Sequence, residues 1–241
     1  AKVTSWLEAN RSSPFFLYFT PNAVHEPVAP NPKFTGSRYA KYGDFIQELD
    51  WSVGQVLATL DRLKLTENTL LIFTSDNGGV VNRNNEHVAK AMDAGLAING
   101  SLRGGKHEIW EGGFREPFLV RWPGNVPAGT VSDQVICLTD VLATMAHVLD
   151  APLPKGNAED SLDVLRAFTE AKPGALVRDH VIVQAADGTY AVRQGDWKLI
   201  EHADAPKLEF RNKKKAAQTE KKKKSAPQHD ELFNLTTDPA E

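Results

Sequence analysis

The stretch that decides the fold is residues 69–79, which read Thr-Leu-Leu-Ile-Phe-Thr-Ser-Asp-Asn-Gly-Gly. A short apolar run that is bounded by turn residues is typical of a β-strand covered on both faces. The glycines let the backbone turn immediately after it. Asp76 and Asn77 are therefore predicted at the carboxyl end of a strand, where open α/β sheets usually build their sites.

Asp76 and Asn77 offer one charged and one neutral oxygen ligand. Such a pair suits a hard cation such as calcium or magnesium. Asp-Asn-Gly is also an ordinary turn, and for an isolated tripeptide that is the commoner interpretation. The segments before and after the turn decide between the two interpretations.

The segment downstream is rich in glycine and positive charge. Residues 102–117 read Leu-Arg-Gly-Gly-Lys-His-Glu-Ile-Trp-Glu-Gly-Gly-Phe-Arg-Glu-Pro, so that Lys106 lies between two Gly-Gly pairs. Such a loop can bring backbone and cationic side chains close to a small anion. It leads into a predicted strand at 118–124. Upstream, the run Phe-Phe-Leu-Tyr-Phe at 15–19 predicts another strand, followed by a stiff loop that carries His25.

These pieces, in this order, resemble the later part of a sulfatase of the alkaline-phosphatase superfamily, close to the arylsulfatases. The resemblance also includes the helix around Asp50, the run Gly-Asp-Trp-Lys-Leu-Ile at 195–200 and the run at 231–241, so it spans almost the whole chain. It implies an α/β fold with a layered sheet and helices, here incomplete, and a small C-terminal antiparallel sheet.

The resemblance also implies a reaction, the metal-dependent hydrolysis of sulfate esters, with calcium as the metal and magnesium as the alternative. Asp76 and Asn77 match the family's second pair of metal ligands. Lys106 matches the lysine that binds the sulfate. His25 matches the histidine that contacts the sulfate and can protonate the leaving oxygen. We therefore expect His25 and Lys106 to be catalytic and substrate-binding residues.

Other polar and aromatic side chains near these motifs are given lesser roles. Arg103 and Arg115 are expected to pair with carboxylates that shape the loop. Asp50 and Trp197 are expected to be structural. His107 is a further candidate for lining the pocket.

One element of the family pattern does not occur in the chain. Sulfatases carry a Cys-x-Pro-x-Arg or Ser-x-Pro-x-Arg signature whose first residue becomes formylglycine, and neither sequence is found here. The only cysteine, Cys137, has apolar neighbours and is predicted to be a buried core residue. We therefore expect the chain to be a later portion of a longer protein, with the formylglycine before Ala1, and to be inactive by itself.

Composition agrees with this interpretation. The chain has 241 residues and a formal net charge of -3, which implies neither nucleic acid nor a membrane surface as partner. No stretch is long and apolar enough to span a bilayer. The resemblance implies a sulfated small molecule or glycan as substrate and a periplasmic, extracellular or lysosomal location. The oligomeric state stays open.

Three parts are expected along the chain. Residues 1–150 alternate helical and strand patterns and form the later part of the catalytic domain, with helices at 39–63 and 139–149. Residues 151–175 are rich in proline and glycine and form a connecting segment, with one helix near 162–168.

The third part, residues 176–241, contains short strands separated by Asp-Gly and Gly-Asp turns, which predicts an antiparallel sheet. It includes a lysine-rich segment near 211–226 that is expected to be a disordered loop. A polyanion-binding arm is the alternative interpretation of that segment.

Two other functions stay open at this point. Related members of the superfamily hydrolyse phosphate or phosphonate esters with the same fold and metal site. A non-catalytic domain that binds a metal or a sulfated glycan is the third possibility. The segment that carries the nucleophile would separate these functions.

Overall fold

The computed structural model describes residues 2–171, 174–202 and 229–241, and the chain divides into two compact units. Unit 1 comprises residues 1–74, 80–100 and 117–131. Unit 2 comprises residues 75–79, 101–116 and 132–241. The lysine-rich segment at 211–226, predicted to be a disordered loop, lies outside the described residues.

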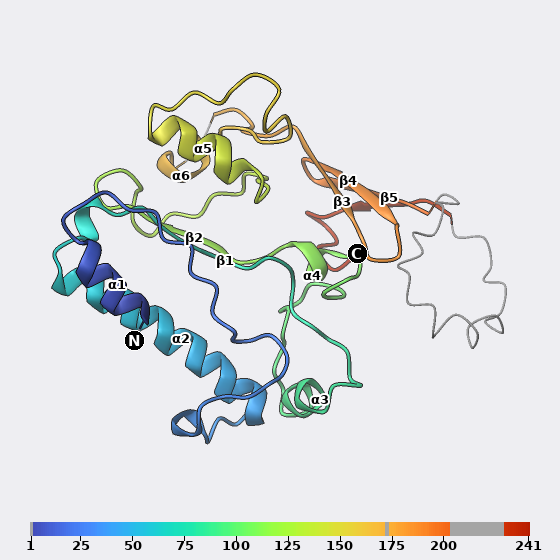
Figure 1. Ribbon diagram of the computed structural model, residues 1–241. Helices are drawn as coiled ribbons and strands as arrows, with labels where there is room; N and C mark the ends of the chain where they lie inside the picture. The colour runs from blue at the N-terminus through green and yellow to red at the C-terminus, as the bar shows by residue number, and fades with distance from the viewer. Residues whose placement is uncertain (1, 172–173, 203–228) are drawn as a thin grey trace. The chain divides into compact units, whose positions relative to one another are not determined.

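Unit 1 is mainly helical. Its described residues include α1 (Lys2–Asn10), η1 (Pro32–Phe34), α2 (Ala40–Arg62), η2 (Thr66–Asn68) and α3 (Glu86–Asp93). α1 lies alongside α2 (Figure 1). The helix predicted at 39–63 is confirmed by α2, whose buried Tyr42 and Phe45 pack with Val88 and Ala91 of α3. None of the helices in the described part of the chain is long and apolar enough to cross a membrane.

The strand that opens the deciding stretch is β1 (Leu71–Thr74), which pairs in antiparallel fashion with β2 (Phe118–Arg121). The pairing sets Leu71 opposite Arg121 and Thr74 opposite Phe118. The expectation that this strand is covered on both faces is wrong: β1 is only partly buried and Thr74 is exposed. β2 is its only strand partner among the described residues, so the sheet is too small to be covered as a central strand would be.

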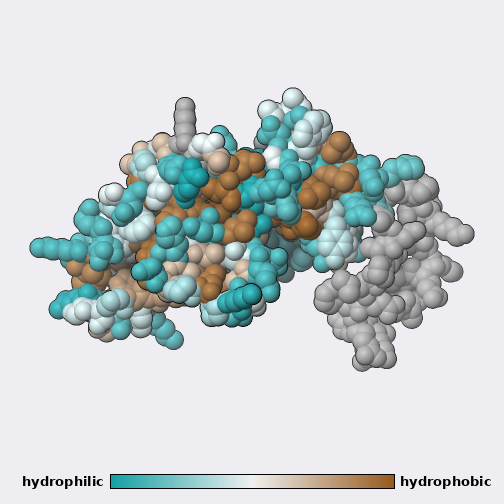
Figure 2. Space-filling view, turned by 90° about the horizontal axis from the view of Figure 1, so that it is seen from above, coloured by the Kyte–Doolittle hydropathy of each residue, from teal (hydrophilic) through white to brown (hydrophobic). Residues whose placement is uncertain are grey.

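The strand predicted at 15–19 is not formed. Its side chains still alternate, since Phe16 and Tyr18 are 77% and 80% exposed while Phe15 and Leu17 are half-buried. A strand needs a neighbour for its backbone ladder, and no described residue provides one for this run. Figure 2 shows hydrophobic surface among the hydrophilic residues on the face that it presents.

Unit 2 contains the antiparallel sheet that the sequence predicts. Its described residues include α4 (Glu111–Phe114), α5 (Asp140–Val148), α6 (Leu165–Thr169), β3 (His180–Gln184), β4 (Tyr190–Gln194), β5 (Trp197–Glu201) and β6 (Glu231–Asn234). The four strands pair in the order β3-β4-β5-β6. Gly188 and Gly195 have φ angles of 94° and 56°, the left-handed conformation that tight hairpin turns require.

Asp140, the first residue of α5, is fully buried and binds the segment that precedes α6. Its carboxylate accepts hydrogen bonds from the backbone N–H groups of Cys137 at 2.8 Å and Leu162 at 3.0 Å, and from Arg178 Nε at 3.0 Å. The helix predicted near 162–168 is formed as α6, which begins at Leu165. Cys137 is half-buried rather than a core residue, since the segment before α5 remains partly at the surface.

Candidate active site

The first part of the candidate site is the Asp-Asn-Gly-Gly turn at 76–79, which follows β1 in the chain. The side chain of Asn77 donates to the carbonyl of Gly78 at 2.9 Å, and Ser75 Oγ donates to the carbonyl of Asn77 at 2.9 Å. These local bonds fix the turn. Asp76 is exposed and Asn77 is half-buried, so both can be reached by a ligand from solvent.

The structure brings this turn together with the loop that carries Lys106. The backbone N–H of Lys106 donates to the carbonyl of Gly79 at 3.1 Å, and the N–H of Gly78 donates to the carbonyl of Gly113 at 3.0 Å. Lys106 is half-buried. Two hydrogen bonds between backbones thus hold the predicted metal ligands next to the predicted sulfate-binding lysine.

The glycines are required because the backbones approach too closely for side chains. A β-carbon at Gly78 would lie 1.8 Å from the carbonyl oxygen of Gly112. A β-carbon at Gly113 would lie 2.3 Å from the carbonyl oxygen of Glu108. Sequence reasoning assigned the Gly-Gly pairs to the approach of an anion. The structure shows that they also let the turn and the loop contact each other.

Glu116, at the end of the same loop, is the residue that sequence reasoning missed. Burial, with a smaller contribution from the negative charges of Asp76 and Glu111, raises the pKa of its carboxyl from 4.5 to about 7. The sequence offers no signal for this shift, because it depends mainly on burial and also on Asp76, which is 40 residues away along the chain. Glu116 is therefore close enough to Asp76 and Glu111 for their negative charge to act on its carboxyl.

That charge fits a bound cation. Hard oxygen donors, one of them charged, next to a further carboxylate are the environment in which a calcium or magnesium ion is favourable. No cluster of three His, Cys, Asp or Glu side chains that could hold a metal occurs within residues 2–171, 174–202 and 229–241. Asp76 and Asn77 therefore supply a fitting but partial set of ligands.

The loop is anchored to the sheet of unit 2 by a buried ionic cluster. Lys198 on β5 is 1% exposed and donates to the carbonyl of Ile109 at 2.8 Å. The same ammonium lies 3.2 Å from Glu111 Oε1 and 2.6 Å from Glu241 Oε1. Arg193 on β4 binds the other oxygen of Glu111 at 3.1 Å. The first turn of α4 is thus fixed from the sheet.

The two arginines of the loop do not pair as predicted. Arg103 stacks on the ring of Trp110, 3.4 Å from its centroid, and donates to the backbone carbonyl of Glu241 at 2.8 Å. It shapes the loop, but through a ring and a carbonyl instead of a carboxylate. Arg115 is exposed and forms no ion pair with any residue that the structure describes.

Two of the predicted histidines lie in ordered loops. His107 is exposed, and its carbonyl accepts from Ala186 N–H at 3.1 Å, a contact of the loop with the sheet. His25 lies in unit 1, is exposed, and has its Nδ1 2.9 Å from the carbonyl of Glu26. That His25 shares a pocket with Asp76 stays a prediction, because the two residues belong to different units.

Comparisons with known proteins identify the family. The model of the sulfatase family matches residues 1–151. The N-acetylgalactosamine-6-O-sulfatase of Bacteroides thetaiotaomicron is 36% identical over 241 residues, which are 100% of this chain and 45% of that protein. The steryl-sulfatase of Rattus norvegicus is 42% identical over 166 residues, 68% of this chain and 28% of that protein.

Solved structures that resemble this chain support the same family. One, from work on the metabolism of multiple glycosaminoglycans by Bacteroides thetaiotaomicron, has a TM-score of 0.83 at 35% identity and covers 99% of this chain and 48% of its own. The PsFucS1 sulfatase from Pseudoalteromonas sp. has a TM-score of 0.73 at 28% identity, and the match covers 99% of this chain and 46% of that sulfatase. The chain spans about half the length of these proteins or less. It belongs to the sulfatase family and has part of the α/β fold of these enzymes.

Proposed function

We propose that the full-length protein that carries this chain hydrolyses sulfate esters, and that its substrate is a sulfated sugar. The observation that carries the proposal is the backbone bonding of the Asp76–Asn77 turn to the Lys106 loop, with 3.1 Å between Lys106 N and Gly79 O. This contact supports the proposal, because it joins the segment that carries Asp76 and Asn77 to the segment that carries Lys106. The family and the names of the sugar sulfatases among the relatives support the choice of ester.

We assign Lys106 the role of binding the sulfate group. A half-buried ammonium is attracted to the sulfuryl oxygens more strongly than a fully solvated one, because less water screens its charge. It acts as a preorganised charge facing the oxygens on which negative charge develops. The glycines on both sides of Lys106 leave room for the anion to approach the loop.

Asp76 and Asn77 are assigned a calcium ion, with magnesium as the alternative hard cation. When bound, the metal would act as a Lewis acid toward the sulfate oxygens, and a formylglycine on sequence outside this chain would supply the nucleophile. Around the metal, the work of this chain is to orient two oxygen ligands. The bond from Asn77 to the Gly78 carbonyl holds the amide of Asn77 in one orientation.

We assign His25 the role of proton donor to the leaving oxygen. An imidazole can donate a proton to a leaving oxygen, and the exposure of His25 lets a substrate reach it. We also propose a periplasmic, extracellular or lysosomal location by family likeness, which cell fractionation would test.

The test uses the purified full-length protein with an aryl sulfate and with N-acetylgalactosamine 6-sulfate. We expect turnover of both, and a loss of about 10²- to 10³-fold in kcat for Lys106→Ala, the usual effect of removing a preorganised charge partner. Lys90→Ala is the control, because Lys90 is an exposed lysine on α3.

Other outcomes would contradict the proposal. A preference for phosphate or phosphonate esters would assign the protein to the other reaction of the superfamily. Calcium or sugar binding without turnover of any ester would indicate a non-catalytic domain. Equal activities of Lys106→Ala and Lys90→Ala would remove Lys106 from the site.

A further inference from the structure

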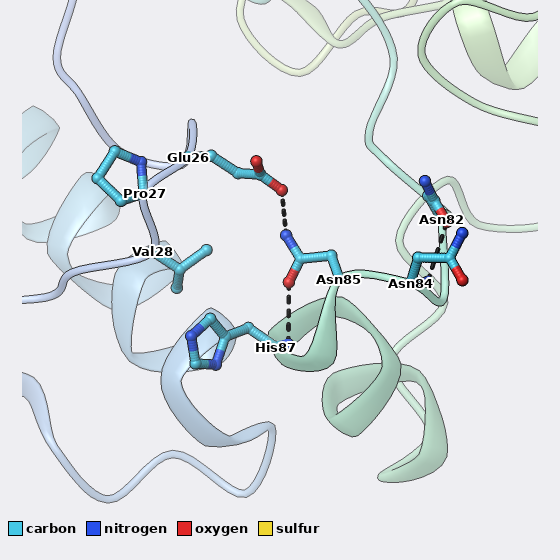
Figure 3. A pocket seen from close by; sticks show the side chains of 7 residues that line it. All are labelled: Glu26, Pro27, Val28, Asn82, Asn84, Asn85 and His87. Atoms are coloured by element: carbon cyan, nitrogen blue, oxygen red, sulfur yellow. Dashed lines mark hydrogen bonds between the residues drawn. The ribbon is translucent and has the colours of Figure 1, made fainter. Parts of the chain in front are cut away.

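A pocket of about 500 Å³ lies in unit 1, next to the loop that carries His25 (Figure 3). This volume is within the range of about 300 to 1,000 Å³ that is usual for small-molecule sites. The side chains that line it include Glu26, Val28, His87 and three asparagines at positions 82, 84 and 85. None of the residues that line the pocket belongs to the site built from the Asp76 turn and the Lys106 loop.

One wall of the pocket is held in place by hydrogen bonds. Asn85 caps α3, since its side-chain oxygen accepts from the N–H groups of His87 at 2.9 Å and Val88 at 3.3 Å. The amide nitrogen of Asn85 donates to the carboxylate of Glu26 (Figure 3). Val28, which lines the pocket, belongs to the same core cluster as Val88, and the two are 7% and 1% exposed. The shape of the pocket is therefore set before a ligand enters.

Other polar groups of the pocket are available to a ligand. Asn84 is exposed, and its side-chain amide makes no hydrogen bond to any described residue. Asn82 accepts a bond from the backbone N–H of Asn84 at 2.9 Å and is itself exposed. An amide offers a donor and an acceptor at once, which matches the hydroxyl and acetamido groups of a sugar.

The charge of the pocket disfavours the sulfate group as its ligand. The lining residues include no lysine or arginine, and Glu26 adds a negative charge. An anion would meet that carboxylate, and His87 is the lining residue that can become cationic. Neutral, hydrogen-bonding groups fit this lining better. The pocket therefore suits the uncharged part of a substrate.

The position of the pocket along the chain indicates which uncharged part of the substrate it binds. His25 directly precedes Glu26 and contacts its carbonyl at 2.9 Å. If His25 protonates the leaving oxygen, the carbon skeleton attached to that oxygen must lie within a few bonds of this loop. We infer that the pocket at Glu26, Asn84 and His87 binds the uncharged sugar ring of the substrate, an inference that rests on the proposed function.

The experiment compares two substrates in the full-length protein. N-acetylgalactosamine 6-sulfate carries the sugar ring, and 4-nitrophenyl sulfate does not. Asn84→Ala is expected to raise KM for the sugar sulfate about tenfold more than KM for the aryl sulfate, which corresponds to one lost hydrogen bond. Asn68→Ala is the matched control, since Asn68 is an exposed asparagine of unit 1 outside the pocket. It should change neither KM.

The outcomes separate this inference from the proposed function. If both sulfates are hydrolysed and Asn84→Ala changes the two KM values equally, or changes neither, the sugar pocket is overturned and the sulfatase stands. If neither sulfate is hydrolysed, the proposed function fails. Calorimetry with N-acetylgalactosamine then decides on the pocket. Weaker binding to Asn84→Ala than to Asn68→Ala would support it, and equal binding would overturn it.

Discussion

Lys198→Met is the perturbation whose effect the structure defines best. The side chain is 1% exposed and its ammonium contacts the Ile109 carbonyl, Glu111 and Glu241. Methionine has a similar length, so it fills the space without a large cavity. The change therefore removes the charge and its three partners while it leaves the packing of β5 nearly intact.

The loss in the free energy of unfolding follows from the charges that Lys198→Met leaves buried. Removing one partner of a buried ion pair destabilises by about 3 to 5 kcal/mol, because the other charge stays buried and unpaired. Glu111 keeps Arg193 at 3.1 Å, so its charge remains compensated. Glu241 loses the ammonium 2.6 Å from its Oε1. We therefore expect a loss near the lower end, about 3 kcal/mol.

Urea unfolding measures this loss. With a slope of about 2 kcal/mol per molar urea, the midpoint should fall by about 1.5 M. Glu241→Gln in the same chain should recover part of the loss, because it removes the stranded charge. The control is Lys90→Met, which changes an exposed lysine. The reasoning is refuted if Lys198→Met and Lys90→Met shift the midpoint equally.

Three further predictions concern the turn and the loop. Gly78→Ala should lower calcium affinity at least about tenfold, since its β-carbon would lie 1.8 Å from the Gly112 carbonyl oxygen. Gly54→Ala is the control, because a β-carbon at Gly54 has open space and should leave the affinity unchanged. Calorimetry on the full-length protein compares the two variants. Asp76→Ala should abolish measurable calcium binding in the same experiment, and an unchanged affinity would remove Asp76 from the metal site. Glu116 has a raised pKa, so the folded state holds more protons than the unfolded state between pH 4.5 and about 7, and the stability of the metal-free protein should fall as pH rises through that window. Glu116→Gln should remove this slope in chelator-treated protein, and an identical pH profile in both proteins would show that Glu116 is not its source.

Much of the fold could be predicted because its signals are local. The apolar positions of α2 recur at helical spacing, and the hairpins of unit 2 have glycine at their turns. α3 was missed although Asn85 followed by Glu86 is a helix start signal. The strand predicted at 15–19 failed because pairing is not a local property.

β5 shows why site detail was harder to predict. Its alternation places Trp197 and Leu199 on one face and Lys198 and Ile200 on the other. Hydrophobicity alone favours the tryptophan face as the buried one. The structure buries the lysine face instead, with Trp197 51% exposed, because Glu111 and the Ile109 carbonyl meet Lys198 there. Such partners come from elsewhere in the chain and leave no trace in the strand itself.

The contact of the Asp76 turn with the Lys106 loop has a consequence for the timing of binding and chemistry. The two segments are joined by the hydrogen bonds Gly78 to Gly113 and Lys106 to Gly79. Both bonds run from backbone to backbone, so they do not depend on a side-chain rotamer. The distance between the backbone of the Asp76 turn and the backbone of the Lys106 loop is therefore fixed during folding. In the function that we propose, these two backbone segments would not have to rearrange when a substrate binds, so they would lose little conformational entropy at that moment.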